Sequence, residues 1–138
     1  MRRVAILSRC GARTGEGPVL RTKQVSGALT RMTEAPELRF VSYKQGRLAY
    51  REAGVGRALL FLHGMNGNSK SWAFAFQALS PSFRVVAWDA PSCGKSDSFG
   101  DSLEDYLAAV KALIRSLELQ DVVVIGHSMG GLVATSLA

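Results

Sequence analysis

Three runs of consecutive apolar residues lie in the central and C-terminal parts of the chain: Ala58–Leu62, Val85–Trp88 and Val122–Ile125. Strands that are covered on both faces have this continuous pattern, which is typical of parallel sheets. Upstream, residues Leu38–Tyr43 alternate roughly between apolar and polar, and a turn at residues 44–47 leads into a second extended run, Leu48–Glu52. This alternation predicts a β-hairpin ahead of the parallel strands.

Helical periodicity lies between and after these strands. Trp72, Phe76 and Leu79 share one face of a predicted helix. Ser102 and Asp105 have the spacing of a capping box. An apolar stripe with helical spacing follows: Leu103, Leu107, Val110, Ile114 and Leu117. The order is therefore a hairpin followed by β-α-β-α-β-α, which predicts an α/β fold with a doubly wound sheet.

The net charge of +6 comes entirely from the beginning of the chain. Residues 1–31 hold seven of the 17 Lys and Arg residues and one of the 11 Asp and Glu residues, so the remaining chain is neutral. The remaining chain has no basic field that would attract nucleic acid. No apolar run approaches the roughly 20 residues that cross a bilayer, which excludes a membrane span.

We interpret residues 1–35 as a basic, disordered leader and residues 36–138 as a partial α/β domain. The apolar run at residues 4–7 is too short for a secretory signal, whereas the Arg-rich composition leaves an organelle-targeting segment as an alternative. Because charge and periodicity change at Met32, we favour a translation start there. The two cysteines, Cys10 and Cys93, are too few for a disulfide framework, and as free thiols they fit the cytoplasm.

The third apolar run leads directly into Gly126-His127-Ser128-Met129-Gly130-Gly131. A serine on a sharp strand-to-helix turn needs small residues two positions away on each side, and Gly126 and Gly130 meet this need. Gly131 gives additional room. Such a turn exposes the serine hydroxyl and directs the N-terminus of the next helix at a developing negative charge. The pattern predicts that Ser128 is a catalytic nucleophile.

A second motif, His63-Gly64-Met65, follows the first apolar run. Such a turn can place a backbone N–H beside the nucleophile, and the N–H of Met65 is the best candidate. The second donor is the N–H of Met129, the residue after the serine. We predict that these two groups form an oxyanion hole and that His63, Gly64 and His127 support the two turns. No pattern in the sequence implies a cofactor or a metal ion.

These motifs resemble the α/β-hydrolase family, in particular its small enol-lactone hydrolases, carbon–carbon bond hydrolases and simple esterases. The matching pieces are His63-Gly64 with Trp72, residues 87–97, and Gly126–Gly131. The resemblance implies the N-terminal portion of an α/β-hydrolase fold, an acyl-accepting Ser128, oxyanion-hole N–H groups from Met65 and Met129, and a small ester- or lactone-like substrate. Branches of the family with an aspartate nucleophile are disfavoured because position 128 is serine.

The chain departs from the family pattern in two ways. Ser92 stands where the turn after the second parallel strand usually has its first glycine, at a cost of about 1 kcal/mol if φ is positive there. In addition, the family order is Ser…Asp/Glu…His, and neither His63 nor His127 follows Ser128. Asp89 is expected to tie its own turn together, and Asp97, Asp101 and Asp105 are expected in loop and cap positions. We therefore expect the acid and the histidine in a missing C-terminal half, without which the chain alone is inactive.

An alternative hypothesis is that the chain is a non-catalytic α/β remnant that acts as an interaction module. It would pair through the edge of the strand at Val122–Ile125, which we expect to be bare. A bare apolar edge also predicts aggregation of the isolated chain. A nucleic-acid or mitochondrial-surface protein that binds through its basic leader rests on composition alone. No pattern in the sequence indicates an oligomeric state.

Overall fold

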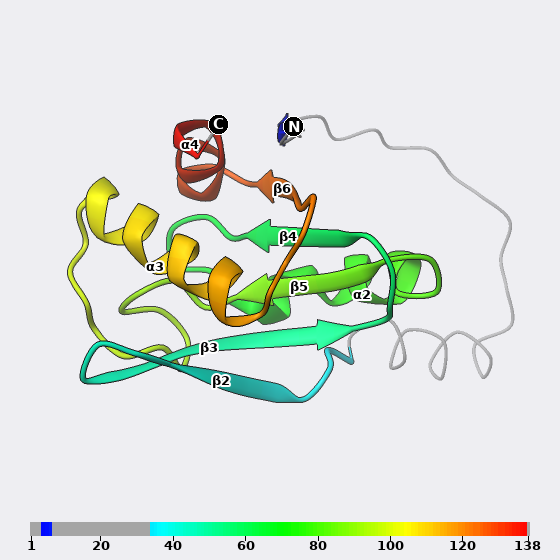
Figure 1. Ribbon diagram of the computed structural model, residues 1–138, viewed down its shortest axis with the longest axis horizontal. Helices are drawn as coiled ribbons and strands as arrows, with labels where there is room; N and C mark the ends of the chain where they lie inside the picture. The colour runs from blue at the N-terminus through cyan, green and yellow to red at the C-terminus, as the bar shows by residue number, and fades with distance from the viewer. Residues whose placement is uncertain (1–3, 7–33, 138) are drawn as a thin grey trace, which may run out of the picture.

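The computed structural model describes residues 4–6 and 34–137 of the chain. Within these residues the strands are β1 (Val4–Ile6), β2 (Leu38–Tyr43), β3 (Gly46–Ala53), β4 (Ala58–Leu62), β5 (Arg84–Trp88) and β6 (Val123–Gly126). The helices are the 3₁₀ helix η1 (Ser69–Trp72) and the α-helices α2 (Ala73–Leu79), α3 (Leu103–Ser116) and α4 (Met129–Ser136) (Figure 1).

All of these strands belong to one six-stranded sheet with the order β1-β6-β4-β5-β3-β2 (Figure 1). Strands β1, β6, β4 and β5 are parallel to one another, and the antiparallel hairpin β2–β3 joins them through β3 and β5. The predicted hairpin and the three predicted parallel strands are confirmed. Strand β6 is displaced by one residue toward the C-terminus relative to the prediction.

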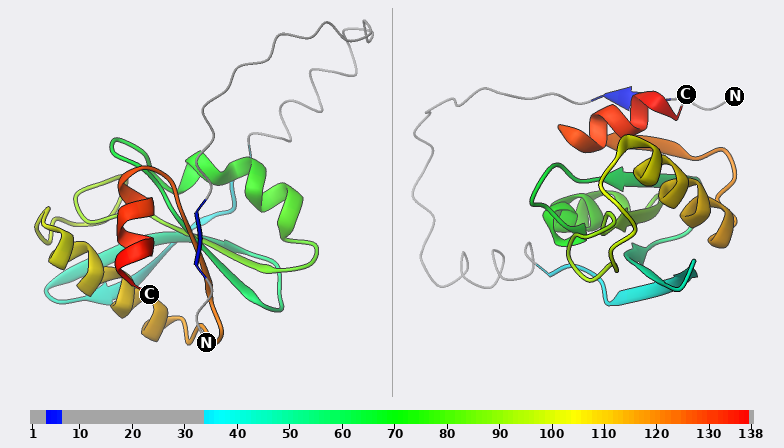
Figure 2. Two further views of the ribbon diagram at one scale, coloured as in Figure 1. Left: turned by 90° about the horizontal axis from the view of Figure 1, so that it is seen from above. Right: turned by 90° about the vertical axis from the view of Figure 1, so that its left-hand side faces the viewer.

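Helices cover both faces of the parallel part of the sheet, which explains the continuous apolar runs. Leu60 and Leu62 of β4 pack on the face covered by α3 and α4, whereas Leu59 and Phe61 pack on the face covered by α2. Figure 2 shows α2 on one side of the sheet and α3 and α4 on the other. The predicted α/β architecture is therefore confirmed in its layers as well as in its element order.

The predicted helix around Trp72 is two elements in the structure. Residues Ser69–Trp72 form η1, which Asn68 caps through its side chain, and α2 begins only at Ala73. Further along, Ser102 caps α3 as predicted: its hydroxyl accepts a hydrogen bond from the N–H of Asp105 at 3.1 Å. None of the helices described here is long and apolar enough to cross a bilayer.

Strand β1 differs from the expectation for the basic leader. Val4, Ala5 and Ile6 align in parallel with Val124, Ile125 and Gly126 of β6. The edge of β6, expected to be bare, is therefore paired, because backbone N–H and C=O groups at a sheet edge are satisfied by any segment that can extend beside them. The expectation of disorder is wrong for Val4–Ile6. The rest of the leader up to residue 33, including Met32, lies outside the described residues.

Candidate active site

Ser128 lies at the sharp turn between β6 and α4. Its backbone has φ 53° and ψ −120°, a sparsely populated combination for a non-glycine residue that costs about 1–3 kcal/mol. The residue is exposed, and its side chain does not cap α4. No hydrogen-bond partner for its hydroxyl is found among residues 34–137. The strained turn therefore presents a hydroxyl that is free to react.

Two glycines make this turn sterically possible. A Cβ on Gly126 would lie 2.1 Å from the carbonyl oxygen of Gly130, and a Cβ on Gly130 would lie 2.2 Å from the carbonyl oxygen of Leu62. Both obstacles are backbone atoms. By contrast, a Cβ on Gly131 would meet its nearest atom at 3.5 Å, which is ordinary contact. The predicted need for small residues is thus met at positions 126 and 130, and the glycine at 131 is dispensable.

The turn after β4 lies against the serine turn, as the second motif predicted. A Cβ on Gly64 would be 3.1 Å from the Cβ of Ser128 and 2.9 Å from Nδ1 of His127. The backbone N–H of His127 donates to the carbonyl oxygen of Leu62 at 3.0 Å, so the ends of β4 and β6 are joined. Glycine at position 64 therefore allows this close approach, whereas a larger residue would displace the side chain of His127 and press on Ser128.

The backbone N–H groups of Met65 and Met129 donate no hydrogen bond to the residues that the structure describes. In α4 the first hydrogen bonds are donated by Gly130 and Gly131, and Met129 occupies the first helical position, whose N–H has no partner within a helix. The N–H of Met65 has no acceptor in the described part of the chain. Met65 and Met129 line the same pocket.

His63 is a structural residue in this fold. Its side chain is 1% exposed, its Nδ1 donates to the carbonyl oxygen of Gly64 at 2.7 Å, and its Nε2 accepts from the N–H of Ala90 at 3.0 Å. Burial lowers the pKa of His63 below its usual value, although the Gly64 carbonyl and Asp89 act in the opposite direction. With both ring nitrogens engaged, His63 has no nitrogen left to accept a proton from Ser128.

Asp89 links the start of η1 to the loop that follows β5. Its buried carboxylate accepts hydrogen bonds from the N–H of Ser69 at 2.7 Å and from the N–H of Lys95 at 2.8 Å. A Cβ on Gly94 would lie 2.1 Å from this carboxylate. Ser92, in the same loop, has φ 63°, so the left-handed conformation anticipated for the missing glycine is present. These contacts match the expected role of Asp89 in its own turn.

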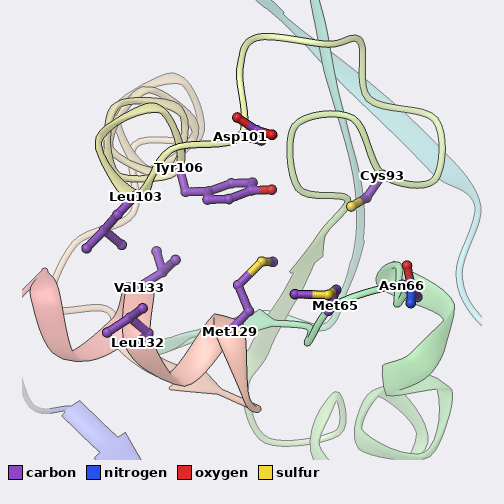
Figure 3. Close-up of a pocket in the computed structure, with 9 residues that line it drawn as sticks. All are labelled: Met65, Asn66, Cys93, Asp101, Leu103, Tyr106, Met129, Leu132 and Val133. Carbon is purple, nitrogen blue, oxygen red and sulfur yellow. The ribbon is translucent and has the colours of Figure 1, made fainter.

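Two pockets flank the serine turn. The first, of about 450 Å³, is lined mainly by apolar side chains from three parts of the chain: Met65, Leu103, Tyr106, Met129, Leu132 and Val133 (Figure 3). Cys93, Asp101 and Asn66 complete its wall. The second, of about 430 Å³, is lined by residues including His63, Gly64, Trp72 and His127.

Sequence reasoning missed the wall of the first pocket. Asp101 lies just before α3 and Tyr106 lies in its first turn, more than 20 residues before Ser128 in the chain, and only the packing of α3 beside α4 brings them to the site. No local pattern distinguishes Tyr106 from other half-buried helical residues. Within the described residues no group of three or more His, Cys, Asp and Glu side chains could hold a metal ion.

Residues 59–138 match the alpha/beta hydrolase family, a span that includes the turn at Gly64, the Asp89 loop and the strained serine. The chain belongs to this family. Its resemblance to the α/β-hydrolases in sequence motifs is thereby confirmed, and so is the predicted partial α/β-hydrolase fold.

Individual relatives and solved structures agree with this assignment. An uncharacterized protein of Mycobacterium bovis is 35% identical over 105 residues, covering 75% of this chain and 31% of its own length. A 2-hydroxy-6-oxononadienedioate/2-hydroxy-6-oxononatrienedioate hydrolase of Dechloromonas aromatica is 34% identical over 78% of this chain and 41% of its own length. The crystal structure of an epoxide hydrolase from Vigna radiata superposes with a TM-score of 0.68 at 29% identity, over 73% of this chain and 33% of that one.

The chain thus spans about a third of the length of the first of these relatives and less than half of the second. The hydrolase activities named for these proteins belong to chains that extend well beyond the part matched here.

Proposed function

We propose that Ser128 is the nucleophile of a serine hydrolase that acts on esters, lactones or related carbonyl compounds. The observation that carries the proposal is a strained, exposed serine with an uncommitted hydroxyl on a turn that lies against the turn of Met65, together with the unused N–H groups of Met65 and Met129. Backbone N–H groups that face a developing oxyanion are worth about 3–4 kcal/mol each in known hydrolases.

The reaction that fits this arrangement has two steps. Ser128 Oγ attacks the substrate carbonyl carbon and passes its proton to a base, and the resulting oxyanion is stabilised by the two N–H groups. Collapse of this intermediate breaks the bond to the leaving group, which takes up the proton, and leaves an acyl-serine. Water then attacks the acyl-serine and releases the acid, and the proton returns to Ser128.

The base has to come from another part of the protein. Both ring nitrogens of His63 are engaged in hydrogen bonds, and His127 occupies the variable position of the serine turn. In this family the acid and the histidine follow the serine in the chain. We propose that both are supplied by sequence beyond residue 138 and that residues 1–138 alone lack turnover. Removing the base from a serine triad costs about 10⁴–10⁶ in kcat.

The Vigna radiata epoxide hydrolase shares the fold, but an aspartate nucleophile is expected in that branch and position 128 of this chain is serine. We therefore propose the chemistry of those family branches in which a serine forms an acyl-enzyme. The alternative of a non-catalytic interaction module loses its main support, because it depends on an open edge at β6 and β1 pairs with that edge.

Covalent labelling with a fluorophosphonate probe tests the proposal. In a protein that carries this chain together with the sequence that follows it, we expect labelling that is abolished in Ser128→Ala and unchanged in Ser136→Ala, a matched change at an exposed serine of α4. Equal labelling of the wild type and Ser128→Ala would remove Ser128 as the nucleophile.

A further inference from the structure

The first pocket is well suited to hold part of a substrate. It is bounded by Met65 and Met129, whose N–H groups form the proposed oxyanion hole, so a group bound in it starts at the reacting carbonyl. The side chain of Met129 extends toward Tyr106, and the side chain of Met65 extends toward Met129 (Figure 3). Leu132, on the next turn of α4, is 57% exposed along the wall of this pocket. An apolar chain bound here would cover it, at about fourfold in affinity for each buried methylene.

The charge in the wall of this pocket is negative. None of its nine lining residues is Lys, Arg or His, and the one charged side chain among them is Asp101. Asp101 takes part in no ion pair within the described residues. Asp105, on the same helix start, is hydrogen-bonded to Ser102 and has Lys44 in its surroundings, and the buried Asp89 lies behind Cys93.

Two lining side chains have raised pKa values, mainly because they are partly buried. The pKa of Tyr106 is raised by burial and further by Cys93, Asp101 and Asp105. The pKa of the Cys93 thiol is raised by burial and by Asp89. Both shifts have the direction that carboxylates and a low-dielectric wall produce. Binding of a ligand that carries a carboxylate is therefore unfavourable for two reasons: the carboxylate would lose its hydration, and it would be repelled by the negative charge of Asp101.

Tyr106 adds a requirement of its own. Its hydroxyl points into the pocket toward the side on which Cys93 lies (Figure 3), and it has no hydrogen-bond partner among the residues described. In the free protein, water can accept a hydrogen bond from this hydroxyl. A wholly apolar ligand would displace that water and leave the hydroxyl unpaired, which is unfavourable, whereas a ligand oxygen could accept its proton.

We propose that this pocket binds the acyl part of the substrate, and that this part is a neutral, mostly apolar chain with a hydrogen-bond acceptor for Tyr106. The inference rests on the proposed function, since an acyl part exists only if Ser128 attacks a carbonyl group. Asp101 and Tyr106 are then specificity-determining residues. Asp101 weakens the binding of acyl chains that carry a carboxylate, and Tyr106 favours acyl chains with an oxygen atom that can accept its hydrogen bond.

The test uses three methyl esters with six-carbon acyl chains: methyl hexanoate, methyl 5-oxohexanoate and monomethyl adipate. Ser128→Ala prevents turnover, so dissociation constants can be measured on the longer protein used for labelling, from the NMR shifts of ¹³C-labelled Met65 and Met129 methyl groups. We expect methyl 5-oxohexanoate to bind about threefold more tightly than methyl hexanoate. Monomethyl adipate should bind at least tenfold more weakly than methyl 5-oxohexanoate.

Variants then assign the selectivity to residues. Adding Asp101→Asn should reduce the deficit of monomethyl adipate, that is, its weaker affinity relative to methyl 5-oxohexanoate, to about threefold. Glu104→Gln, which removes the same charge from an exposed position outside the pocket at the start of α3, should leave the deficit unchanged. Tyr106→Phe should abolish the preference for the 5-oxo chain, and methyl hexanoate should bind more tightly because it no longer leaves a hydroxyl unpaired.

The outcomes separate this inference from the proposed function. Binding of monomethyl adipate as tight as that of the neutral esters, or absence of any methyl shift while Ser128 of the longer protein is still labelled by fluorophosphonate, would overturn the inference alone. Selective binding of the neutral esters without labelling of Ser128 would instead refute the nucleophile and leave a neutral binding pocket.

Discussion

Gly126 and Gly131 offer a direct test of why the serine turn needs glycine. Gly126 ends β6 two residues before Ser128, Gly131 lies in the first turn of α4 three residues after it, and alanine adds one methyl group at either place. At position 126 this methyl carbon would lie 2.1 Å from the carbonyl oxygen of Gly130 and 2.5 Å from the nitrogen of Gly131. Ordinary contact begins near 3.4 Å, so β6 and α4 would have to separate by about 1.3 Å.

The expected free energies follow from these distances. Overpacking typically costs 1–3 kcal/mol, and because the obstacle at position 126 is backbone we expect Gly126→Ala to lower the free energy of unfolding by about 3 kcal/mol. At position 131 the nearest atom is at 3.5 Å, and the residue is inside α4. Replacing a helical glycine by alanine gains about 0.5–1 kcal/mol, so Gly131→Ala should be stabilising.

Urea unfolding followed by the fluorescence of the buried Trp88 measures both effects. The two free energies should differ by roughly 4 kcal/mol, which for a chain of this size separates the midpoints by about 2 M urea. If the two alanine variants unfold at midpoints within about 0.3 M of each other, the steric account of the serine turn is wrong.

Further predictions concern burial, backbone strain and the sheet edge. Because burial depresses the pKa of His63, the unfolded chain binds more protons than the folded one, so stability is retained above about pH 6.5 and falls below it. The urea midpoint should therefore be lower at pH 5.5 than at pH 7.5 in the wild type and in His127→Gln, and this difference should be smaller in His63→Asn. Ser92→Gly should raise the free energy of unfolding by about 1 kcal/mol, because φ is 63° there, and Ser98→Ala, which removes only the hydroxyl partner of Ser92, should not reproduce the gain. Ala5→Pro should disrupt the pairing of β1 with β6 and increase self-association in light scattering; scattering equal to that of the wild type would show that β1 does not protect this edge.

The strands and the serine turn could be predicted from the sequence because their signals are local. Five consecutive apolar residues at Ala58–Leu62 are enough to indicate a strand covered on both faces, and glycines on both sides of Ser128 indicate the sharp turn. The family resemblance marked Ser92 as a position where a positive φ would be costly without glycine, and φ is 63° there.

Features that depend on distant partners could not be predicted in this way. Three residues, Val4–Ile6, carry no periodicity of their own, and only the backbone of β6 makes them a strand. Tyr106 and Asp101 become pocket residues through the packing of α3 against α4. The division of the helix at Trp72 depends on the cap that Asn68 provides.

The position of β1 has a consequence for the order of folding. Val4 aligns with Val124, so β1 cannot pair until the chain has been synthesised as far as β6. Contacts of such long sequence separation form late and slow folding. Because the last residue of β6 lies two positions before Ser128, the partner strand of β1 and the reactive turn are supplied by the same stretch of chain.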